Sequence, residues 1–554
     1  MRGIVSSPPG SKSVPGEQQA PEAIARALED FLAENPRAVV LEDGKALFDM
    51  REAKYSLATE HGRCTLHLWD ENRNLVRKVS ATTSRNGVLR LSTHRFGQTR
   101  PQTLELAADR DRRTPSTREA TRVKYLKVLE RVMEKGLPEW KADGFRTAMD
   151  LEKSFGPAYA RGSLVKGSQA WAVIAVNEEE TQAIVDGILT LGILWLHHCR
   201  ESGDGRRVYQ GLKLIVPRGM AMLTLSRLAW LNNNVAQWEL WELDQQTEEL
   251  EQRDAADHGN LTTRLVHAPN EEAARERFGD AAARVMALVP DAMRGVVEQR
   301  IRSGTELAFL LHGLEFARTR LAYSGNSFNS RQEITFGAGA NETPLTDESE
   351  GELRELVVRL FARRNAAGDK RDPLYRLQPE RWLESVLRRD VEPLDIHLDK
   401  AHVYTQVPAF AAADRGMLDL LGVTGHGRLA VIELKADEDL HLALQGLDYW
   451  IRVRWHHLQT ADSATGPSFG LGEFQRHGYF GGVRLSEEAP RLYLVAPALR
   501  VHPATEVVLR YLSPRVEWVL VGLDERWRAK VKAVWRKRSG STEMKMNLTR
   551  PQVP

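Results

Sequence analysis

The sequence lacks several features that would place it in common functional classes. Only two of its 554 residues, Cys64 and Cys199, are cysteines. Two cysteines cannot build a disulfide framework, so we expect a reducing, cytoplasmic environment. The most apolar stretch, residues 184–196, is too short to span a bilayer and contains Asp186, so no membrane partner is expected. Without a Walker motif the chain should not drive itself along DNA by ATP hydrolysis, and any motor would be a separate partner.

An excess of charge of one sign is also missing. The chain carries 77 Lys and Arg against 75 Asp and Glu residues, a formal net charge of +2. Any surface that binds nucleic acid must therefore come from local basic patches. The hydrophobic content of 42% and charged content of 27% are ordinary for a globular protein, and 554 residues are too many for one core. Several domains are expected.

Polar residues converge in one predicted β-hairpin near the C-terminus. Residues 417–423 and 428–435 are two apolar runs around a glycine-containing turn. Because strand side chains alternate, Glu433 and Lys435 share one face, and a suitable register would put Asp419 beside Glu433. Two converging carboxylates repel each other unless a hard divalent cation such as Mg²⁺ lies between them. The alternative is a solvated ion pair between Glu433 and Lys435 at a sheet edge.

Two predicted helices flank this hairpin. The helix expected over residues 438–457 places Gln445 and Tyr449 at positions i and i+4, so that both project from one face. The helix upstream of the hairpin carries Glu380 and Glu384, either of which could add a carboxylate to the site. We favour Glu384.

The order of these polar residues resembles the PD-(D/E)XK superfamily of metal-dependent nucleases, and the Q-x-x-x-Y element resembles its RecB-like branch. The resemblance covers roughly residues 377–524. It implies an α/β fold of the restriction-endonuclease type, a mixed central β-sheet flanked by helices, which hydrolyses phosphodiester bonds in DNA with Mg²⁺ or Mn²⁺. It also implies the following roles: metal ligation by Asp419, Glu433 and the Leu434 carbonyl, assistance to the attacking water by Lys435, support of the site by Gln445 and Tyr449, and an additional carboxylate from Glu384.

The N-terminal half contains a degenerate copy of the same pattern. Residues 172–177 align with residues 430–435, and Ala175 and Asn177 stand where the second copy has Glu and Lys. The position matching the Asp of the hairpin is expected near Val165, which is apolar. This copy should bind no hard cation and should not cut. Chance similarity of short hydrophobic strands is the alternative.

The remaining segments complete a domain scheme, in which Asn86-Gly87 marks a hairpin turn of a β-rich module. The predicted division is a disordered lead over 1–22, the β-rich module over 23–115, the degenerate copy over 116–250, a helical connecting segment over 251–370, the nuclease-like domain over 371–524, and a basic C-terminal tail over 525–554.

Two basic and aromatic segments, residues 469–484 and 526–538, are candidates for contact with nucleic acid. Aromatic rings stack on bases, and Lys and Arg bind phosphates. The alternative for each is a solvated charged surface. The residues predicted to bind are Arg476, Tyr479, Arg526, Arg528, Lys530 and Lys532.

Two classes of function follow from the sequence. The first is a Mg²⁺-dependent nuclease acting on DNA in repair or defence, with RNA not excluded as a substrate. The second is a non-catalytic protein that keeps the nuclease-like fold to bind nucleic acid or to assemble with others. A homo-oligomer and a separate motor or repair partner both remain open.

Overall fold

The computed structural model describes most of the chain in two compact units, residues 1–114 with 335–349, and residues 115–334 with 350–554. No described helix is both long and apolar enough to cross a bilayer, and Cys64 and Cys199 are buried free thiols. The described ranges are 20–36, 38–42, 45–50, 53–60, 63–69, 74–85, 88–94, 102–107, 115–149, 155–202, 206–256, 263–323, 330–338, 342–411, 414–458 and 472–540.

The N-terminal module is an antiparallel sheet covered by one helix. Helix α1 (Pro21–Glu34) buries Ile24 and Leu28 against the sheet, whose strand order is β2-β1-β7-β6-β5-β4-β3. The strands are β1 (Val39–Glu42), β2 (Lys45–Asp49), β3 (Lys54–Glu60), β4 (Arg63–Trp69), β5 (Asn74–Arg85), β6 (Val88–His94) and β7 (Gln102–Ala107). The predicted turn at Asn86-Gly87 lies outside the described residues, as does the predicted lead up to residue 19, and Pro21 already begins α1.

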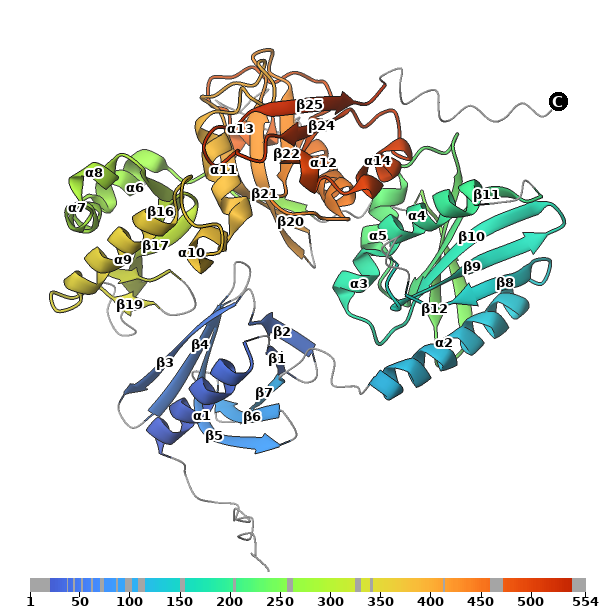
Figure 1. Ribbon diagram of the computed structural model, residues 1–554, viewed down its shortest axis with the longest axis horizontal. Coiled ribbons are helices and arrows are strands. Elements are labelled where there is room, and N and C mark those ends of the chain that lie inside the picture. The colour runs from blue at the N-terminus through green and yellow to red at the C-terminus, as the bar shows by residue number, and fades with distance from the viewer. Residues whose placement is uncertain are drawn as a thin grey trace, which may run out of the picture. The chain divides into compact units, whose positions relative to one another are not determined.

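The first sheet domain comprises β8–β13 and α2–α5, with strand order β13-β12-β11-β10-β9-β8. Strands β10, β11 and β12 run parallel, while β9 and β13 are antiparallel to their neighbours. Helix α2 lies on one face and α4 on the other (Figure 1). The elements are α2 (Pro115–Gly136), β8 (Lys141–Arg146), β9 (Tyr159–Lys166), β10 (Gln169–Val176), α3 (Gln182–Asp186), α4 (Ile188–Glu201), β11 (Val208–Pro217), α5 (Met222–Leu228), β12 (Gln237–Asp244) and β13 (Glu249–Arg253).

The second sheet domain comprises β20–β25 and α11–α14, and its sheet has the order β14-β20-β21-β22-β23-β24-β25. Strands β22, β23 and β24 are parallel, whereas β21 and β25 are antiparallel to their neighbours. The elements are α11 (Pro379–Arg389), β20 (Tyr404–Ala411), β21 (Asp414–Val423), β22 (Leu429–Leu434), α12 (Leu442–Leu458), α13 (Glu473–Arg476), β23 (Arg491–Pro497), the 3-10 turn η1 (Ala498–Arg500), α14 (Pro503–Arg510), β24 (Trp518–Leu523) and β25 (Ala533–Arg538).

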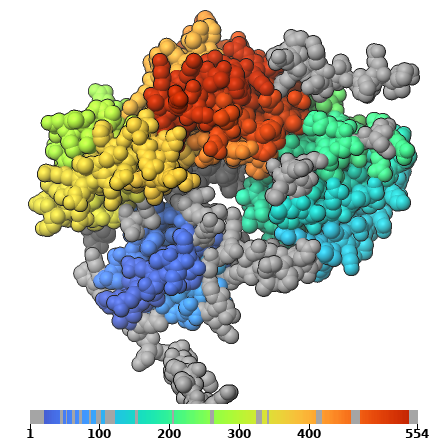
Figure 2. Space-filling view, viewed as in Figure 1, coloured from blue at the N-terminus to red at the C-terminus, as the bar shows by residue number. Residues whose placement is uncertain are grey.

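Strand β22 is apolar on both faces because helices cover both sides of its sheet. Ile432 and Leu434 pack into the core beneath α11, and Leu429 and Val431 pack into the core beneath α12. Continuous apolar runs of this kind are typical of strands buried on both sides. The C-terminal residues form one closely packed mass, orange to red in Figure 2. The protein is therefore α/β, with several sheets and helices on their faces.

The prediction of a helical segment over 251–370 is only partly met, because residues 297–323 form antiparallel strands. Strand β16 is a continuous apolar run, which periodicity alone does not distinguish from a buried helix. The two-residue turn His312-Gly313, with φ of 47° and 75°, makes it a hairpin instead. The elements here are β14 (Thr263–Leu265), α6 (Glu271–Arg277), α7 (Gly279–Leu288), α8 (Asp291–Arg294), β15 (Val297–Ser303), β16 (Glu306–Leu311), β17 (Leu314–Tyr323), β18 (Ser330–Phe336), β19 (Thr343–Pro344), α9 (Glu350–Arg363) and α10 (Pro373–Arg376).

The predicted basic tail also differs from the structure over its first part. Residues 533–538 form the edge strand β25, paired antiparallel with β24. Trp535 packs against the backbone of Gly522, and Lys537 Nζ contacts Glu506 Oε1 at 2.6 Å. This charged segment therefore forms a strand, because every second side chain packs against the sheet. The remainder of the predicted tail, residues 541–554, lies outside the described residues.

Candidate active site

The register of β21 and β22 brings the two predicted carboxylates together. The antiparallel ladder pairs Leu420 with Ile432, so that the next position sets Asp419 beside Glu433. The backbone N–H of Leu434 donates to Asp419 Oδ2 at 2.9 Å, in place of a backbone acceptor on β21. Ile432 and Leu434 are buried on the opposite face, as the alternation of the strand requires.

Lys435 is the cation of the site. Its ammonium lies 3.3 Å from Glu433 Oε1, 3.7 Å from Asp439 Oδ2 and 3.9 Å from Glu380 Oε1. Burial alone would lower the pKa of Lys435, but the charges of Glu433 and Glu380 raise it above its ordinary value. Lys435 is therefore a charged donor at neutral pH.

The surroundings of the two carboxylates disfavour their negative charges. Burial, followed by the charge of Glu384, raises the pKa of Asp419 to about 7. Burial and the charge of Asp419 raise the pKa of Glu433 well above its usual range, although Lys435 opposes the shift. Glu433 Oε2 is buried and has no hydrogen-bond partner within the described part of the chain. Such a pair favours either a shared proton or a bound cation.

Helix α12 covers the face of the sheet on which the two carboxylates lie. Gly446 lets the helix approach, because a Cβ there would meet Leu492 and Leu494 and lie 3.6 Å from Glu433 Cβ. The preceding residue, Gln445, has a buried side-chain oxygen with no hydrogen-bond partner among the described residues. Burial, and then the charges of Glu433 and Asp419, raise the pKa of Tyr449. Gln445 and Tyr449 thus lie on the helix that packs over the paired carboxylates.

The position of Glu384 differs in an important way from the role predicted for it. Its carboxylate is buried on α11, but its oxygens are held by Arg300 Nη1 at 2.7 Å, Arg381 Nη1 at 3.2 Å and Gln406 Nε2 at 2.6 Å. Arg300 comes from β15 and is also bound by Glu298 at 2.9 Å. Glu384 is near enough to influence Asp419, yet it is engaged in a buried ion-pair network. The carboxylate of α11 that contacts Lys435 is that of Glu380.

Gln406 is a site residue that the sequence reasoning missed. It falls between the pairs Thr405–Leu420 and Val407–Leu418, so it lies beside Asp419 on the neighbouring strand. Its φ of 54° is unusual for a non-glycine residue and marks a local distortion of β20. No motif pointed to Gln406, because only the strand register and the left-handed backbone reveal it.

The oxygen donors at this position suit a hard divalent cation. Carboxylates and a backbone carbonyl are the ligands that Mg²⁺ and Mn²⁺ prefer, and the unsatisfied Glu433 oxygen provides an acceptor for one. The described residues contain no group of three His, Cys, Asp or Glu side chains arranged as metal ligands. A cation here would depend on Asp419, Glu433, the Leu434 carbonyl and water.

The residues predicted to bind nucleic acid divide into two groups. Tyr479 is only 4% exposed and its hydroxyl donates to the Val266 carbonyl at 3.0 Å, so it cannot stack on a base, contrary to the prediction. The guanidinium of Arg528 lies over the Trp527 ring at 4.1 Å, and Arg476 is partly buried. The exposed candidates are Arg526, Lys530 and Lys532.

These exposed cations lie at the same edge of the sheet as the candidate site. Strands β22, β23 and β24 are parallel, so their C-terminal ends share one edge. Lys435 follows β22, Arg500 follows β23, and the loop with Arg526 and Lys530 follows β24. Asp437 influences the pKa of Arg528, which also places this loop near the site. Arg500 is exposed as well and was not among the predicted residues.

The first sheet domain has no carboxylate pair at the equivalent place. Ile174 pairs with Leu214 of β11 as Glu433 pairs with Leu494 of β23, so Ile174, and not the predicted Ala175, is the structural counterpart of Glu433. Arg161, and not the predicted Val165, lies opposite Ile174. Ala175 is buried on the other face of the sheet, beneath α2. Val176 stands at the position of Lys435, and Asn177, the predicted counterpart, accepts from the backbone N–H of Glu179 at 3.0 Å.

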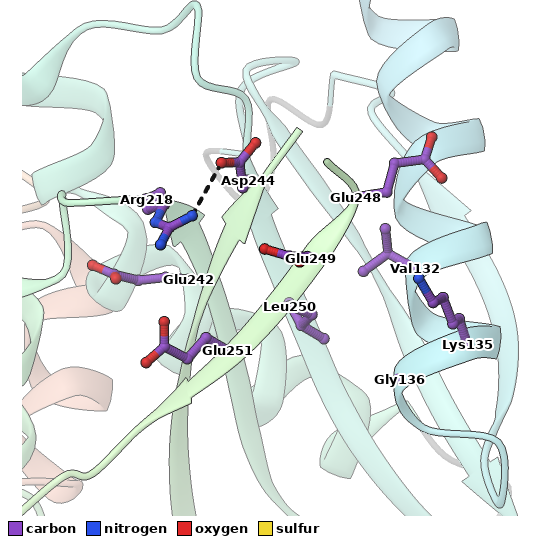
Figure 3. Close-up of a pocket in the computed structure, with 10 residues that line it drawn as sticks. All are labelled: Val132, Lys135, Gly136, Arg218, Glu242, Asp244, Glu248, Glu249, Leu250 and Glu251. Atoms are coloured by element: carbon purple, nitrogen blue, oxygen red, sulfur yellow. Dashed lines mark hydrogen bonds and ion pairs between the residues drawn. The ribbon is translucent and has the colours of Figure 1, made fainter. Parts of the chain in front are cut away.

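A separate hollow of about 440 Å³ lies between α2 and the β12–β13 hairpin. Figure 3 shows Glu248 and Glu249 among the residues that line it, with Arg218 paired to Asp244 at 3.3 Å. None of its lining residues belongs to the candidate site.

Comparison with known proteins gives little guidance. No protein-family model matches the chain, and no curated protein matches it. Among solved structures it is similar to the crystal structure of a repair endonuclease from Pyrococcus abyssi, with 12% sequence identity and a TM-score of 0.15, over 41% of this chain and 97% of that chain. A likeness this weak supports no inference about fold or function.

Proposed function

We propose that the second sheet domain is a metal-dependent nuclease that hydrolyses phosphodiester bonds in DNA and uses Mg²⁺ or Mn²⁺. The observation that carries the proposal is the buried pair of Asp419 and Glu433, in which one Glu433 oxygen lacks a hydrogen-bond partner among the described residues and Lys435 lies 3.3 Å from the other. A buried carboxylate oxygen without a partner is an acceptor that a bound divalent cation would satisfy.

The residues divide the chemistry between them. When held by Asp419, Glu433 and the Leu434 carbonyl, the divalent ion would polarise the phosphodiester and lower the pKa of a bound water. The Lys435 ammonium orients that water or offsets charge developing on the phosphate. Tyr449 and Gln445, on the helix α12 that packs over the carboxylates, support the geometry of the site. Glu384, bound by Arg300 and Gln406, positions its neighbours.

The exposed basic residues support a polyanionic substrate. Arg500, Arg526, Lys530 and Lys532 follow strands whose ends share the edge with Lys435, so a phosphate backbone bound there would pass close to the carboxylates. Their contribution is local, which agrees with the small net charge of the chain. RNA offers the same phosphates, so matched DNA and RNA substrates must be compared.

We also propose that both sheet domains have the restriction-endonuclease-like fold and arose by duplication. Support comes from their common sequence of orientations: one antiparallel hairpin, two parallel crossovers through helices, and a final antiparallel strand. In this view the first copy lost its site, with Arg161, Ile174 and Val176 at the positions of Asp419, Glu433 and Lys435.

A cleavage assay tests the catalytic proposal directly. The full chain is incubated with fluorescent single-stranded and duplex DNA, plasmid and matched RNA, with Mg²⁺, with Mn²⁺ or with EDTA. We expect metal-dependent cleavage, and a loss of roughly 10²–10⁴-fold in rate for Lys435→Ala. Asp419→Asn and Glu433→Gln should lose both cleavage and Mn²⁺ binding by calorimetry, because each removes an anionic ligand.

Glu488→Gln is the matched control, since Glu488 is an exposed carboxylate of the same domain with 66% of its side chain accessible. It should cleave like the wild type. Cleavage that persists in Asp419→Asn and Lys435→Ala would show a contaminating nuclease. Tight DNA binding with no cleavage under any metal would favour the non-catalytic alternative.

A further inference from the structure

The two sheet domains contact each other reciprocally. Leu231 precedes β12 in the first domain, and Leu512 precedes β24 in the second, so the two residues hold equivalent places in their sheets. They form an antiparallel bridge with each other. On either side, Asn232 N donates to Tyr511 O at 2.9 Å, and Ser513 N donates to Trp230 O at 2.7 Å. Each bond is the counterpart of the other, as in an interface with two-fold symmetry.

The side chains around this bridge repeat the reciprocal pattern. Trp230 of the first domain packs on Trp450 of α12 in the second, with ring centroids 4.7 Å apart. Tyr511 of the second domain packs on His197 of α4 in the first, with centroids 6.2 Å apart. Helix α4 contacts α14, and α12 contacts α5, so the long helix of each domain meets the short helix of the other.

The interface is part of a continuous core. Buried residues of both domains, including Leu196, Leu228, Leu447 and Leu509, belong to one apolar cluster. The fully paired Arg227–Asp448 contact, at 2.7 and 2.6 Å, adds a buried ion pair between α5 and α12. A second chain could not pack against these residues unless the two sheet domains of this chain first separated.

We propose that the first sheet domain covers the surface of the second sheet domain on which another active copy would dock. One chain is then a two-domain unit with a single catalytic centre, and it nicks one strand of duplex DNA per binding event. This inference rests on the proposed function. In each event one water adds across one P–O bond, leaving a phosphate on one new end and a hydroxyl on the other. A self-complementary pair of active domains would cut both strands.

Supercoiled plasmid distinguishes the two modes. The full chain with Mg²⁺ should convert supercoiled to open-circular DNA first, with linear DNA appearing only after nicks accumulate on both strands. The initial rate should be proportional to protein concentration, and the active species should sediment as one chain. A fivefold excess of the inactive Asp419→Asn chain, with DNA still in excess over total protein, should leave the nicking rate unchanged, because no mixed dimer forms.

Different failures have different meanings. Linear DNA formed directly from supercoiled plasmid, a rate that rises with the square of the protein concentration, or inhibition by the Asp419→Asn chain would overturn this inference while leaving the nuclease proposal intact. An absence of cleavage on every substrate would overturn the proposed function and this inference with it.

Discussion

Asp419 and Glu433 are two carboxylates in an environment that disfavours the charged form of each. Both carboxylates are buried: burial, followed by the charge of Glu384, raises the pKa of Asp419, and burial, followed by the charge of Asp419, raises the pKa of Glu433. The Leu434 N–H and the Lys435 ammonium oppose the shift without abolishing it. In the absence of a cation the pair is therefore a cost to stability, which a bound divalent ion would remove.

The raised pKa of Asp419 predicts a pH-dependent affinity for metal. The folded carboxyl binds its proton with a pKa of about 7, against 3.8 ordinarily, so the folded chain holds more protons than the unfolded chain between these values. Stability without metal should therefore fall as pH rises from about 4 to 7. Metal must displace the proton, so affinity should rise by up to about tenfold per pH unit as the pH approaches 7.

Calorimetric titration of Mn²⁺ at pH 5.5, 6.5, 7.5 and 8.5 measures this dependence. Thermal unfolding with and without Mg²⁺ provides a second readout, in which the added stability should be larger at pH 8 than at pH 5.5. Asp419→Asn should remove the dependence together with most of the affinity. A wild-type affinity that is the same at every pH would contradict the assignment of Asp419 as a ligand.

How far the sequence predicts the site depends on how local each contact is. Strand alternation and motif order were enough to place Asp419, Glu433 and Lys435, because their register is set within one hairpin. Glu384 is held by Arg300, 84 residues upstream, and Tyr479 is buried against Val266, more than 200 residues upstream. No pattern in a single sequence reveals partners this distant.

At the scale of elements, α11 depends on the hairpin of β16 and β17. Leu311 and Leu314 pair across the two-residue turn His312-Gly313. The turn packs so closely on α11 that a Cβ on Gly313 would lie 2.0 Å from the Arg381 carbonyl oxygen. The His312 ring stacks on Trp382, with centroids 5.0 Å apart. The β16–β17 hairpin thus supports the helix that carries Glu380 and Glu384. The sequence pattern had predicted a helix where this turn lies.

Gly313→Ala should therefore be strongly destabilising. Its φ of 75° costs an alanine about 1–3 kcal/mol, and the contact with the Arg381 carbonyl adds to that value. We expect the free energy of unfolding in urea to fall by at least about 2 kcal/mol. Gly304→Ala is the control, because Gly304 lies in the preceding turn and a Cβ there would have 3.6 Å to its nearest contact. Equal stability of the two variants would refute the close packing of this turn on α11.

On the scale of the whole second unit, the two sheet domains act as one folded body. Their apolar cores merge, and their backbones pair at Leu231 and Leu512. Matching strands in the sequence led us to predict a duplication. They could not indicate that the two sheet domains face each other, because the residues of the bridge at Leu231 and Leu512 look like ordinary loop residues in the sequence. Merged cores predict one cooperative unfolding transition for this unit.

The buried ion pair between α5 and α12 allows that cooperativity to be tested. Arg227 binds Asp448 through two hydrogen bonds, and the side chains are only 5% and 12% exposed. Asp448→Asn removes the negative partner and leaves a buried guanidinium without its compensating charge, which typically costs about 3–5 kcal/mol. We expect a lower midpoint in urea and, because the helices that join the domains are weakened, a broader or divided transition.

Two further variants make the result specific to the junction. Arg227→Met combined with Asp448→Leu should recover most of the stability, since apolar side chains of similar volume replace a buried pair at little cost. Glu139→Gln removes an exposed partner of Lys166 within the first domain and should change little. If Asp448→Asn unfolds at the same urea concentration as Glu139→Gln, in one equally sharp transition, then the Arg227–Asp448 contact does not hold the two domains together.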